Sequence, residues 1–375
     1  IPMYGRMMHD REGTLNYQAY GKDNQCINSV SRSGLNALLM DEAEAAGAQI
    51  TFEERCHGAD YQRQALFLEN ALTGKSTEAT AEVSFGTDGA FSAVRQSIMK
   101  TDRFNYSQHF IEHGYKELTI PPGEQGAFRM EKNALHIWPR GHYMLIALPN
   151  PDGSFTCTLF LPFEGEPSFA SLDTPEAGRR FFEGEFPDAL AMMPHFDQEW
   201  EHNPAASMVI IRCFPWSRGR TAILGDASHA IVPFYGQGMN SGFEDCRVLD
   251  DMLEEGRSES WEALFERYER QRKPDADAIA DLAMRNFVEM RDLTGDPDFL
   301  LQKKIEARFA ERQPDKWTPL YSLVTFSPDV RYSEALARGK RQDQIMEKIM
   351  ARPDIHEKWD SEGVMEQIRA AVQKQ

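Results

Sequence analysis

The sequence is poor in cysteine, lacks long apolar runs and carries no excess of positive charge. Its five cysteines are scattered with no CxxC pair, so we expect reduced thiols and a cytoplasmic protein. No run of about 18 apolar residues occurs, which predicts no membrane-spanning helix, and we expect no signal peptide. The 10 histidines form no ligand cluster, so no metal site is expected. The net charge of −18 argues against nucleic acid or an anionic membrane as a partner.

The remaining composition is that of an ordinary soluble protein. Hydrophobic residues make up 41% and charged residues 27% of a chain of 375, which is long enough for two packed domains. A GxGxxG motif, the usual dinucleotide-binding turn, does not occur. Any cofactor site in these residues must therefore be built from other elements.

The most informative stretch is residues 221–246, TAILGDASHAIVPFYGQGMNSGFEDC. It predicts a short buried strand, a turn at Gly225 and Asp226, a glycine-rich loop, and a helix from about Gly238. A carboxylate at the end of a strand can accept hydrogen bonds from a sugar hydroxyl. Glycines let the backbone approach a flat ring, and the free N–H groups of a helix start favour negative charge. The stretch therefore indicates a cofactor cradle, whereas each part alone also fits a plain strand-to-helix turn.

Two earlier segments carry further candidates. Residues 29–47 have a strong helical pattern, in which Arg32 near the start is either a phosphate-binding cation or a solvated side chain. Three strands are predicted over residues 48–85, and Asp88-Gly89 follows them. An Asp-Gly pair alone is most often an ordinary turn, but here it continues as Ser-x-Val-Arg.

The rest of the chain predicts a second sheet and then helices. Four alternating apolar runs lie within residues 115–162, and residues 208–214 predict a further strand. Beyond residue 246 the pattern is helical. The expected segments are a long helix over 261–290 interrupted near Pro274, an apolar segment over 319–327, and amphipathic helices over 331–350 and 361–375.

The strings GDASHAIVPFYGQGMNSGFED and DGAFSAVR resemble the flavin motifs of the class A FAD-dependent aromatic hydroxylases, the para-hydroxybenzoate hydroxylase type. The resemblance implies an α/β (α+β) fold: a Rossmann-like FAD-binding domain, a β-sheet substrate domain and C-terminal helices. It assigns residues 1–105 and 208–260 to FAD binding, 106–207 to the substrate sheet and 261–375 to the helical region. The N-terminal GxGxxG unit that holds the ADP part of FAD in this family is expected to be absent from the chain. The implied cofactor-binding residues are Arg32, Asp88, Gly89, Asp226, Gly236, Gly238, Met239 and Asn240.

Four further strings, HGYKEL, NALHIWPRG, RNFVEM and YSLVTFS, resemble the soluble bacterial kynurenine 3-monooxygenases over essentially the whole chain. The resemblance implies that kynurenine's carboxylate is bound by four residues and its amine by Glu289. An Arg among them offers a bidentate fork for a carboxylate. The four residues around the carboxylate are Arg6, Tyr20, Asn286 and Tyr321.

Relatives often carry a second Arg where this chain has Tyr4, so Arg6 should be the sole clamp on its segment. Pro233 and Phe234, with side chains from residues 157–162, are expected to wall the ring of the substrate. The residues alone allow plainer interpretations: a charge at a strand edge for Arg6, a solvated helix face for Asn286 and Glu289, and a core aromatic for Tyr321.

The implied reaction is the FAD- and NADPH-dependent hydroxylation of L-kynurenine to 3-hydroxykynurenine by O2, through a flavin C4a-hydroperoxide. The aniline nitrogen already activates the ring carbon, so we predict no catalytic acid or base, and interpret His229 as a packed motif histidine. Two alternatives stay open: an FAD-dependent hydroxylase of a phenol or aromatic acid, and a truncated non-catalytic fragment that binds a partner. The oligomeric state is undetermined, with a homodimer as one option.

Overall fold

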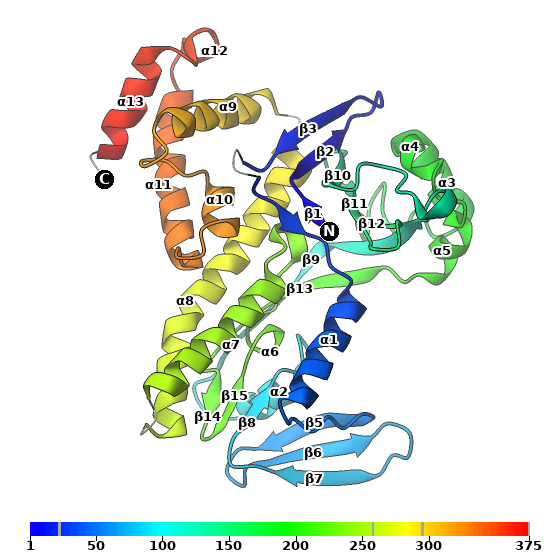
Figure 1. The fold of residues 1–375 in the computed structure, drawn as a ribbon, viewed down its shortest axis with the longest axis vertical. Coiled ribbons are helices and arrows are strands. Elements are labelled where there is room, and N and C mark those ends of the chain that lie inside the picture. Colours follow the sequence, from blue (N-terminus) through cyan, green and yellow to red (C-terminus); the bar gives the residue numbers. More distant parts are fainter. Residues whose placement is uncertain (22–23, 257–258, 294–295, 374–375) are drawn as a thin grey trace.

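The computed structural model describes residues 1–375 apart from 22–23, 257–258, 294–295 and 374–375. It is a mixed α/β fold with a large sheet, a region of small sheets and helices, and a group of C-terminal helices (Figure 1). The strands are β1 (Pro2–Met3), β2 (Gly5–His9), β3 (Leu15–Ala19), β4 (Ile27–Asn28), β5 (Glu54–Asp60), β6 (Ala65–Asn70), β7 (Ser76–Thr80), β8 (Ser84–Gly86), β9 (Asn105–Ile120), β10 (Ala134–Pro139), β11 (Met144–Pro149), β12 (Phe155–Pro162), β13 (Ala206–Phe214), β14 (Ser217–Arg218) and β15 (Thr221–Ile223). The α-helices are α1 (Arg32–Ala45), α2 (Ala93–Met99), α3 (Pro175–Glu185), α4 (Pro187–Leu190), α5 (Phe196–His202), α6 (Asp226–His229), α7 (Gly238–Glu255), α8 (Trp261–Val288), α9 (Pro297–Arg312), α10 (Leu320–Thr325), α11 (Tyr332–Met350), α12 (Ile355–Lys358) and α13 (Glu362–Gln373). Single turns of other helix types are η1 (Glu124–Gly126) and η2 (Pro233–Tyr235), both 3-10, and the π-helix η3 (Glu289–Leu293).

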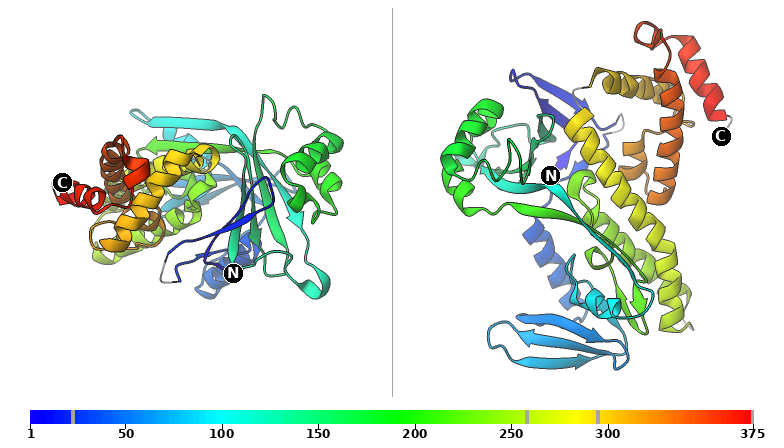
Figure 2. Two further views of the ribbon diagram at one scale, coloured as in Figure 1. Left: turned by 90° about the horizontal axis from the view of Figure 1, so that it is seen from above. Right: turned by 180° about the vertical axis from the view of Figure 1, so that it is seen from behind.

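The large sheet has seven strands in the order β13-β9-β12-β11-β10-β2-β3. Its strand β2 pairs in parallel with β10, so that Arg6 lies opposite Leu135. Helices α3, α4 and α5 cover one end of this sheet, and the core between them contains Trp138, Phe155 and Phe182. Strands β9 and β13 run from this sheet toward the region of small sheets and join the two parts (Figure 2).

The second region surrounds the short parallel pair β8 and β15. Helices α2 and α7 and the first part of α8 pack around this pair, with Ile98, Trp216, Ile223 and Phe265 fully enclosed in the shared core. The separate antiparallel sheet β5-β6-β7 lies at the far end of the molecule, beside α2 (Figure 1). The carboxyl ends of β8 and β15 meet at one edge of their sheet, which brings the two predicted flavin turns together.

The C-terminal helices gather beside the other end of α8 (Figures 1 and 2). Helices α9, α11 and α13 enclose a small core of their own that includes Phe309, Met346 and Ile368. Helix α11 also packs along α8. Within the described residues, no helix is both long enough and apolar enough to cross a bilayer, and no group of His, Cys, Asp and Glu is placed to hold a metal ion.

Most of the predicted elements occur near their predicted bounds. Ser31 caps α1 by accepting a hydrogen bond from the Gly34 N–H. The strand expected from residue 48 begins only at Glu54. The expected interruption near Pro274 is wrong, because α8 continues through this proline. Its neighbours Arg272 and Asp275 are buried and bound to other helices. These tertiary contacts outweigh the lost backbone hydrogen bond.

Candidate active site

The turn after β15 presents a carboxylate outward. Gly225 has φ +58°, a left-handed conformation that glycine adopts without strain. Asp226, which follows it, is exposed, and none of the described residues donates a hydrogen bond to its carboxylate or pairs with it. Partial desolvation raises the pKa of Asp226, while the nearby charges of His229 and Arg32 act in the opposite direction. The carboxylate is thus free to accept hydrogen bonds from a ligand.

Helix α7 points an uncapped start toward the same loop. Gly236 has φ +66°, and Gln237, the residue before the helix, makes no side-chain cap. The first turn contains no acidic residue, so its free N–H groups are not neutralised by this chain. The side chain of Met239 is 49% exposed on this turn, and Asn240 Nδ2 donates to Gln237 Oε1 at 3.0 Å. An 18-residue helix with a bare N-terminus is a favourable place for negative charge on a ligand.

The Asp88-Gly89 turn lies at the carboxyl end of the neighbouring strand β8. The carboxylate of Asp88 is turned back on its own chain, where it accepts hydrogen bonds from the N–H of Ala93 (2.7 Å) and of Val94 (3.2 Å). It therefore caps α2, and its predicted contact with a pyrophosphate stays a prediction. Gly89 has φ +80°, and no atom lies within 4 Å of the place where a Cβ would stand. The backbone here is open to a ligand.

Arg95 connects the two turns. This guanidinium is 2% exposed and donates to the carbonyl of Ala90 at 2.6 Å and to that of Ala227 at 2.7 Å. One carbonyl belongs to each turn, so the side chain fixes their relative position. Arg32 is the first residue of α1 and is exposed; its charge acts to lower the pKa of Asp226.

These features fit the flavin that the sequence predicts. An unpartnered carboxylate, an uncapped helix start and glycines with open space beside them surround one edge of the β8–β15 sheet. The carboxylate suits hydroxyl groups of a ribityl chain, and the helix start suits the negative charge that a reduced flavin carries. The individual contacts of the eight predicted cofactor residues remain predictions.

A half-buried cation, Arg6, lies near the start of β2 and has no counterion among the described residues. The guanidinium carbon of Arg6 stands 4.6 Å from the ring centre of Tyr321 and 5.5 Å from that of Tyr20. The Nε atom of Arg6 and the hydroxyl of Tyr20 are buried and have no hydrogen-bond partner. In the part of the chain that the structure describes, no carboxylate pairs with Arg6. Burial raises the pKa of Tyr20, which keeps its hydroxyl protonated as a donor.

Unpaired buried donors are costly in a folded protein. Arg6 and Tyr20 together offer a positive charge and a hydroxyl donor to whatever enters between them. Tyr321 of α10 completes the group, with its ring stacked on Tyr20 at 5.5 Å between centres. The group is therefore suited to an anion, and a planar carboxylate matches the Arg fork.

The predicted residues of α8 are already engaged with the protein. Asn286 Nδ2 donates to the carbonyl of Phe234 at 2.5 Å and so holds the loop of η2. Glu289 begins the π-helix η3 and accepts from Arg285 Nε at 2.8 Å. A π-helical turn at the end of a long helix is frequent at functional sites. Their contacts with a substrate remain predictions.

Aromatic rings form a wall between the flavin turn and the Arg6 group. Phe234 is buried, stacked on Phe287 at 4.2 Å and tilted against Phe160 of β12 at 4.9 Å. Pro233 is exposed at the start of η2. The ring of Tyr235 stacks on Tyr321 at 5.5 Å and links this wall to the Arg6 group. Phe234 and Phe160 thus share one hydrophobic cluster, whereas Pro233 lies outside it, and their contact with a substrate remains a prediction.

Sequence reasoning missed Tyr235, Phe287 and Asp245. The two aromatic residues directly follow predicted site residues in the strings VPFYGQG and RNFVEM, so their position in the sequence could have identified them. Asp245 ends the FED string of the flavin motif; its partners Gly225 and His229 lie in the same motif, whereas Arg272 lies outside it and could not be assigned from it.

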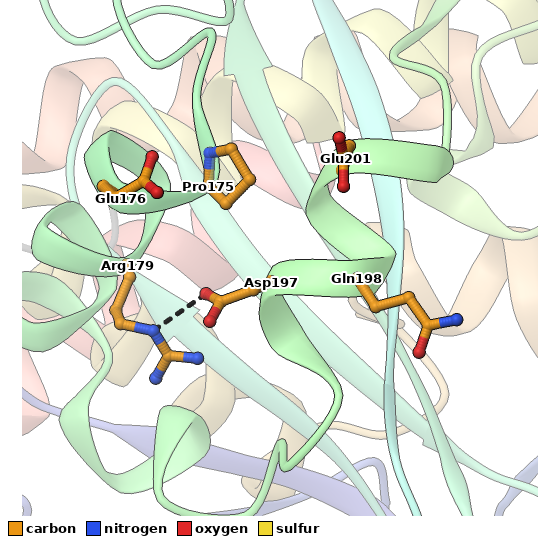
Figure 3. Close-up of a pocket in the computed structure, with 6 residues that line it drawn as sticks. All are labelled: Pro175, Glu176, Arg179, Asp197, Gln198 and Glu201. Atoms are coloured by element: carbon orange, nitrogen blue, oxygen red, sulfur yellow. Dashed lines mark hydrogen bonds and ion pairs between the residues drawn. The ribbon is translucent and has the colours of Figure 1, made fainter.

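A separate depression lies between α3 and α5, with a volume of about 460 Å³ (Figure 3). Arg179 and Asp197 face each other across it, with Nε and Oδ1 2.8 Å apart, and Glu176 and Glu201 lie at its rim. None of the predicted site residues lines it. It is a polar hollow of the helices that cover the large sheet.

The chain is similar to known flavoproteins in sequence and in fold. The profile of a family described as FAD binding domain matches residues 189–283. A protein named kynurenine 3-monooxygenase from Christiangramia forsetii is 48% identical over 100% of this chain and 83% of its own length. A protein of the same name from Myxococcus xanthus is 50% identical over 99% of this chain and 80% of its own length.

Solved structures agree on the fold. A tetrameric form of 2-methyl-3-hydroxypyridine-5-carboxylic acid oxygenase superposes with a TM-score of 0.62 and 21% identity, covering 79% of this chain and 75% of that one. A Klebsiella pneumoniae HpxO variant complexed with FAD gives a TM-score of 0.60 and 18% identity over 84% of this chain and 81% of that one. Identity of 41–50% to proteins of a single name over nearly the whole chain identifies the group within this fold. The chain therefore belongs to the kynurenine 3-monooxygenase family of FAD-dependent hydroxylases.

Proposed function

We propose that this protein is an FAD- and NADPH-dependent monooxygenase that hydroxylates L-kynurenine to 3-hydroxykynurenine. The observation that carries the choice of substrate is the half-buried Arg6, whose buried Nε has no partner, which pairs with no carboxylate of the described residues and lies beside the unpaired hydroxyl of Tyr20. An amino-acid head group supplies the missing carboxylate. A simple phenol supplies none, which disfavours a phenol as the substrate, whereas an aromatic acid such as 4-hydroxybenzoate also carries a carboxylate and is separated by the test below.

The residues of this chain bind and orient the reactants. FAD, when bound, accepts a hydride from NADPH and activates O2 for transfer of a hydroxyl group to the substrate. We assign Asp226 to its ribityl hydroxyls and the N–H groups at the start of α7 to its negative charge. Phe234 and its stacked neighbours exclude water from the reacting ring.

The substrate itself supplies the activation of the ring carbon, through the lone pair of its aniline nitrogen. No acid or base of the protein is therefore assigned to the reaction. His229 is 4% exposed and its Nε2 is bound to Asp245, which suits a packed histidine better than a base. All five cysteines are free thiols, in accord with a cytoplasmic location.

The test compares NADPH oxidation and product formation with L-kynurenine and with 4-hydroxybenzoate. L-Kynurenine should stimulate NADPH oxidation and yield 3-hydroxykynurenine, and 4-hydroxybenzoate should do neither. Stimulation by 4-hydroxybenzoate alone would favour the phenol hydroxylase. A protein that stays colourless after incubation with FAD would favour the non-catalytic alternative.

The variant Arg6→Ala should retain FAD and raise the KM for L-kynurenine by roughly 30-fold, since a charge-assisted hydrogen bond contributes about 2 kcal/mol. Arg11→Ala is the matched control. Arg11 lies on the same segment, and its partner Glu185 belongs to the helices covering the sheet. An unchanged KM in Arg6→Ala would rule out the clamp.

A further inference from the structure

Asp245 is the most enclosed carboxylate near the flavin turn. It lies on α7, has no exposed surface, and accepts hydrogen bonds from three residues. One oxygen, Oδ2, accepts from the Gly225 N–H at 3.0 Å and from His229 Nε2 at 2.5 Å. The other, Oδ1, accepts from Arg272 Nε of α8 at 2.8 Å. These hydrogen bonds outweigh the effect of burial and lower the pKa of Asp245, so it stays ionised.

The two partners of Oδ2 stand on either side of Asp226 in the chain. Gly225 precedes it in the left-handed conformation, and His229 ends the single helical turn that it begins. Both ends of this segment are thus bound to one atom of α7. The Asp226 carboxylate has no partner among the described residues, so its direction is set by its backbone alone.

Arg272 anchors Asp245 on the opposite side. Its guanidinium is 1% exposed and also contacts Glu244 at 3.0 Å and Asp275 at 3.4 Å. Asp275 in turn binds Arg331, the residue before α11, at 2.8 Å. The position of the flavin turn is therefore tied to the long helix through buried charges, which do not reorient easily once formed.

We propose that Asp245 is a positioning residue for the flavin. It holds the backbone of residues 225–229 so that Asp226 meets the ribityl chain, and it does not touch the flavin itself. This inference rests on the proposed role of Asp226 in binding FAD.

The test measures the dissociation constant of FAD by titrating the apoprotein and following flavin fluorescence. Asp245→Asn keeps the shape but cannot accept hydrogen bonds from all three partners, and should weaken FAD binding at least 10-fold. The matched control is Asp275→Asn, which also deprives Arg272 of a buried carboxylate but has no contact with the flavin turn. It should change the constant less than 3-fold. The visible circular dichroism of bound FAD should change only in Asp245→Asn.

An unaltered FAD constant in Asp245→Asn, or an equal weakening in both variants, would overturn the proposal. If Asp245→Asn does not fold, His229→Asn replaces it. That change leaves the pair of Asp245 and Arg272 intact and should weaken FAD binding several-fold, so that an unchanged constant is equally decisive. Asp226→Ala, which removes the acceptor, separates the two levels: if it retains FAD, the proposed cradle itself is wrong, whereas loss there with normal binding in Asp245→Asn removes only the positioning role.

Discussion

Two buried histidines link the strands β2 and β10 of the large sheet. His136 Nε2 donates to the carbonyl of Glu131 at 2.8 Å, and when the ring is neutral its Nδ1 accepts from His9 Nε2 at 2.9 Å. His9 Nδ1 faces Asp188 of α4 at 2.9 Å. Burial lowers the pKa of His136 to about 4. The chain of contacts therefore depends on His136 staying unprotonated.

His136 makes stability depend on pH in a defined direction. A histidine has a pKa near 6.5 when unfolded, so the unfolded chain binds more protons between pH 6.5 and about pH 4, and stability falls as the pH drops through this window. From pH 7 to pH 5 the cost is about 2 kcal/mol. Urea unfolding of the wild type and His136→Gln at both pH values measures it. Between pH 7 and pH 5 the free energy of unfolding should fall by about 2 kcal/mol more in the wild type than in the variant. Equal decreases in both proteins would contradict the assignment.

Single residues could be assigned from the sequence where a motif carried them. The roles of Asp226 and Arg6 were predicted from local strings; the structure leaves Arg6 Nε without a hydrogen-bond partner, and the contacts of both residues with ligands remain predictions. The partners of Asn286 and Asp245 could not be foreseen. They lie 52 and 27 residues away in sequence, at Phe234 and Arg272, and only the folded chain brings them together.

Helices α3 and α5 meet at a glycine. A Cβ at Gly178 would stand 2.4 Å from the ring of Trp200, far inside van der Waals contact. Trp200 cannot move away freely, because it is 3% exposed and its Nε1 donates to the Leu172 carbonyl at 3.0 Å. The close approach of the two helices therefore requires glycine at this position.

Gly178→Ala should destabilise the protein by about 1 to 2 kcal/mol, since overpacking exceeds the gain in helix propensity. Gly184→Ala, in the same helix, is the control. No atom lies within 4 Å of the corresponding Cβ there, so this substitution should be neutral or stabilising by up to about 1 kcal/mol. Denaturant midpoints of the two variants provide the comparison, and equal effects would refute the packing argument.

At the level of elements, periodicity located most strands and helices because it is a local property. The runs within residues 115–162 became β10, β11, β12 and part of β9. The parallel pairing of β2 with β10 could not be predicted, since it joins residues 5–8 to 134–137 across a long connection. This pairing is what carries Arg6 into the large sheet, so the substrate group as a whole was beyond the reach of pattern alone.

At the level of the whole molecule, the proposed site lies between parts that have separate hydrophobic cores. The large sheet, the flavin region and the C-terminal helices each have a hydrophobic cluster. The Arg6 group combines β2 with α10, so the C-terminal helices supply part of the proposed substrate site. The sequence motifs identified these parts one at a time, but not how they sit together.

A paired set of ionic contacts holds the C-terminal helices to α8. Arg285 donates to both carboxylate oxygens of Asp343 on α11, at 2.5 and 2.8 Å. Asp343→Ala should lower stability by about 1 kcal/mol and speed proteolysis within residues 297–373. Glu334→Ala is its control, because Glu334 pairs with Arg338 inside α11 itself. Equal digestion of both variants by trypsin would show that the bridge does not secure these helices.

The most direct test of the account pairs L-kynurenine with kynuramine, the same molecule without the carboxylate. We predict that the wild type prefers L-kynurenine by roughly 30-fold in kcat/KM, and that Arg6→Ala loses most of this preference because the clamp and the carboxylate form one interaction. If Arg6→Ala discriminates between the two substrates as strongly as the wild type does, the Arg6 guanidinium does not bind the carboxylate and the proposed site is wrong.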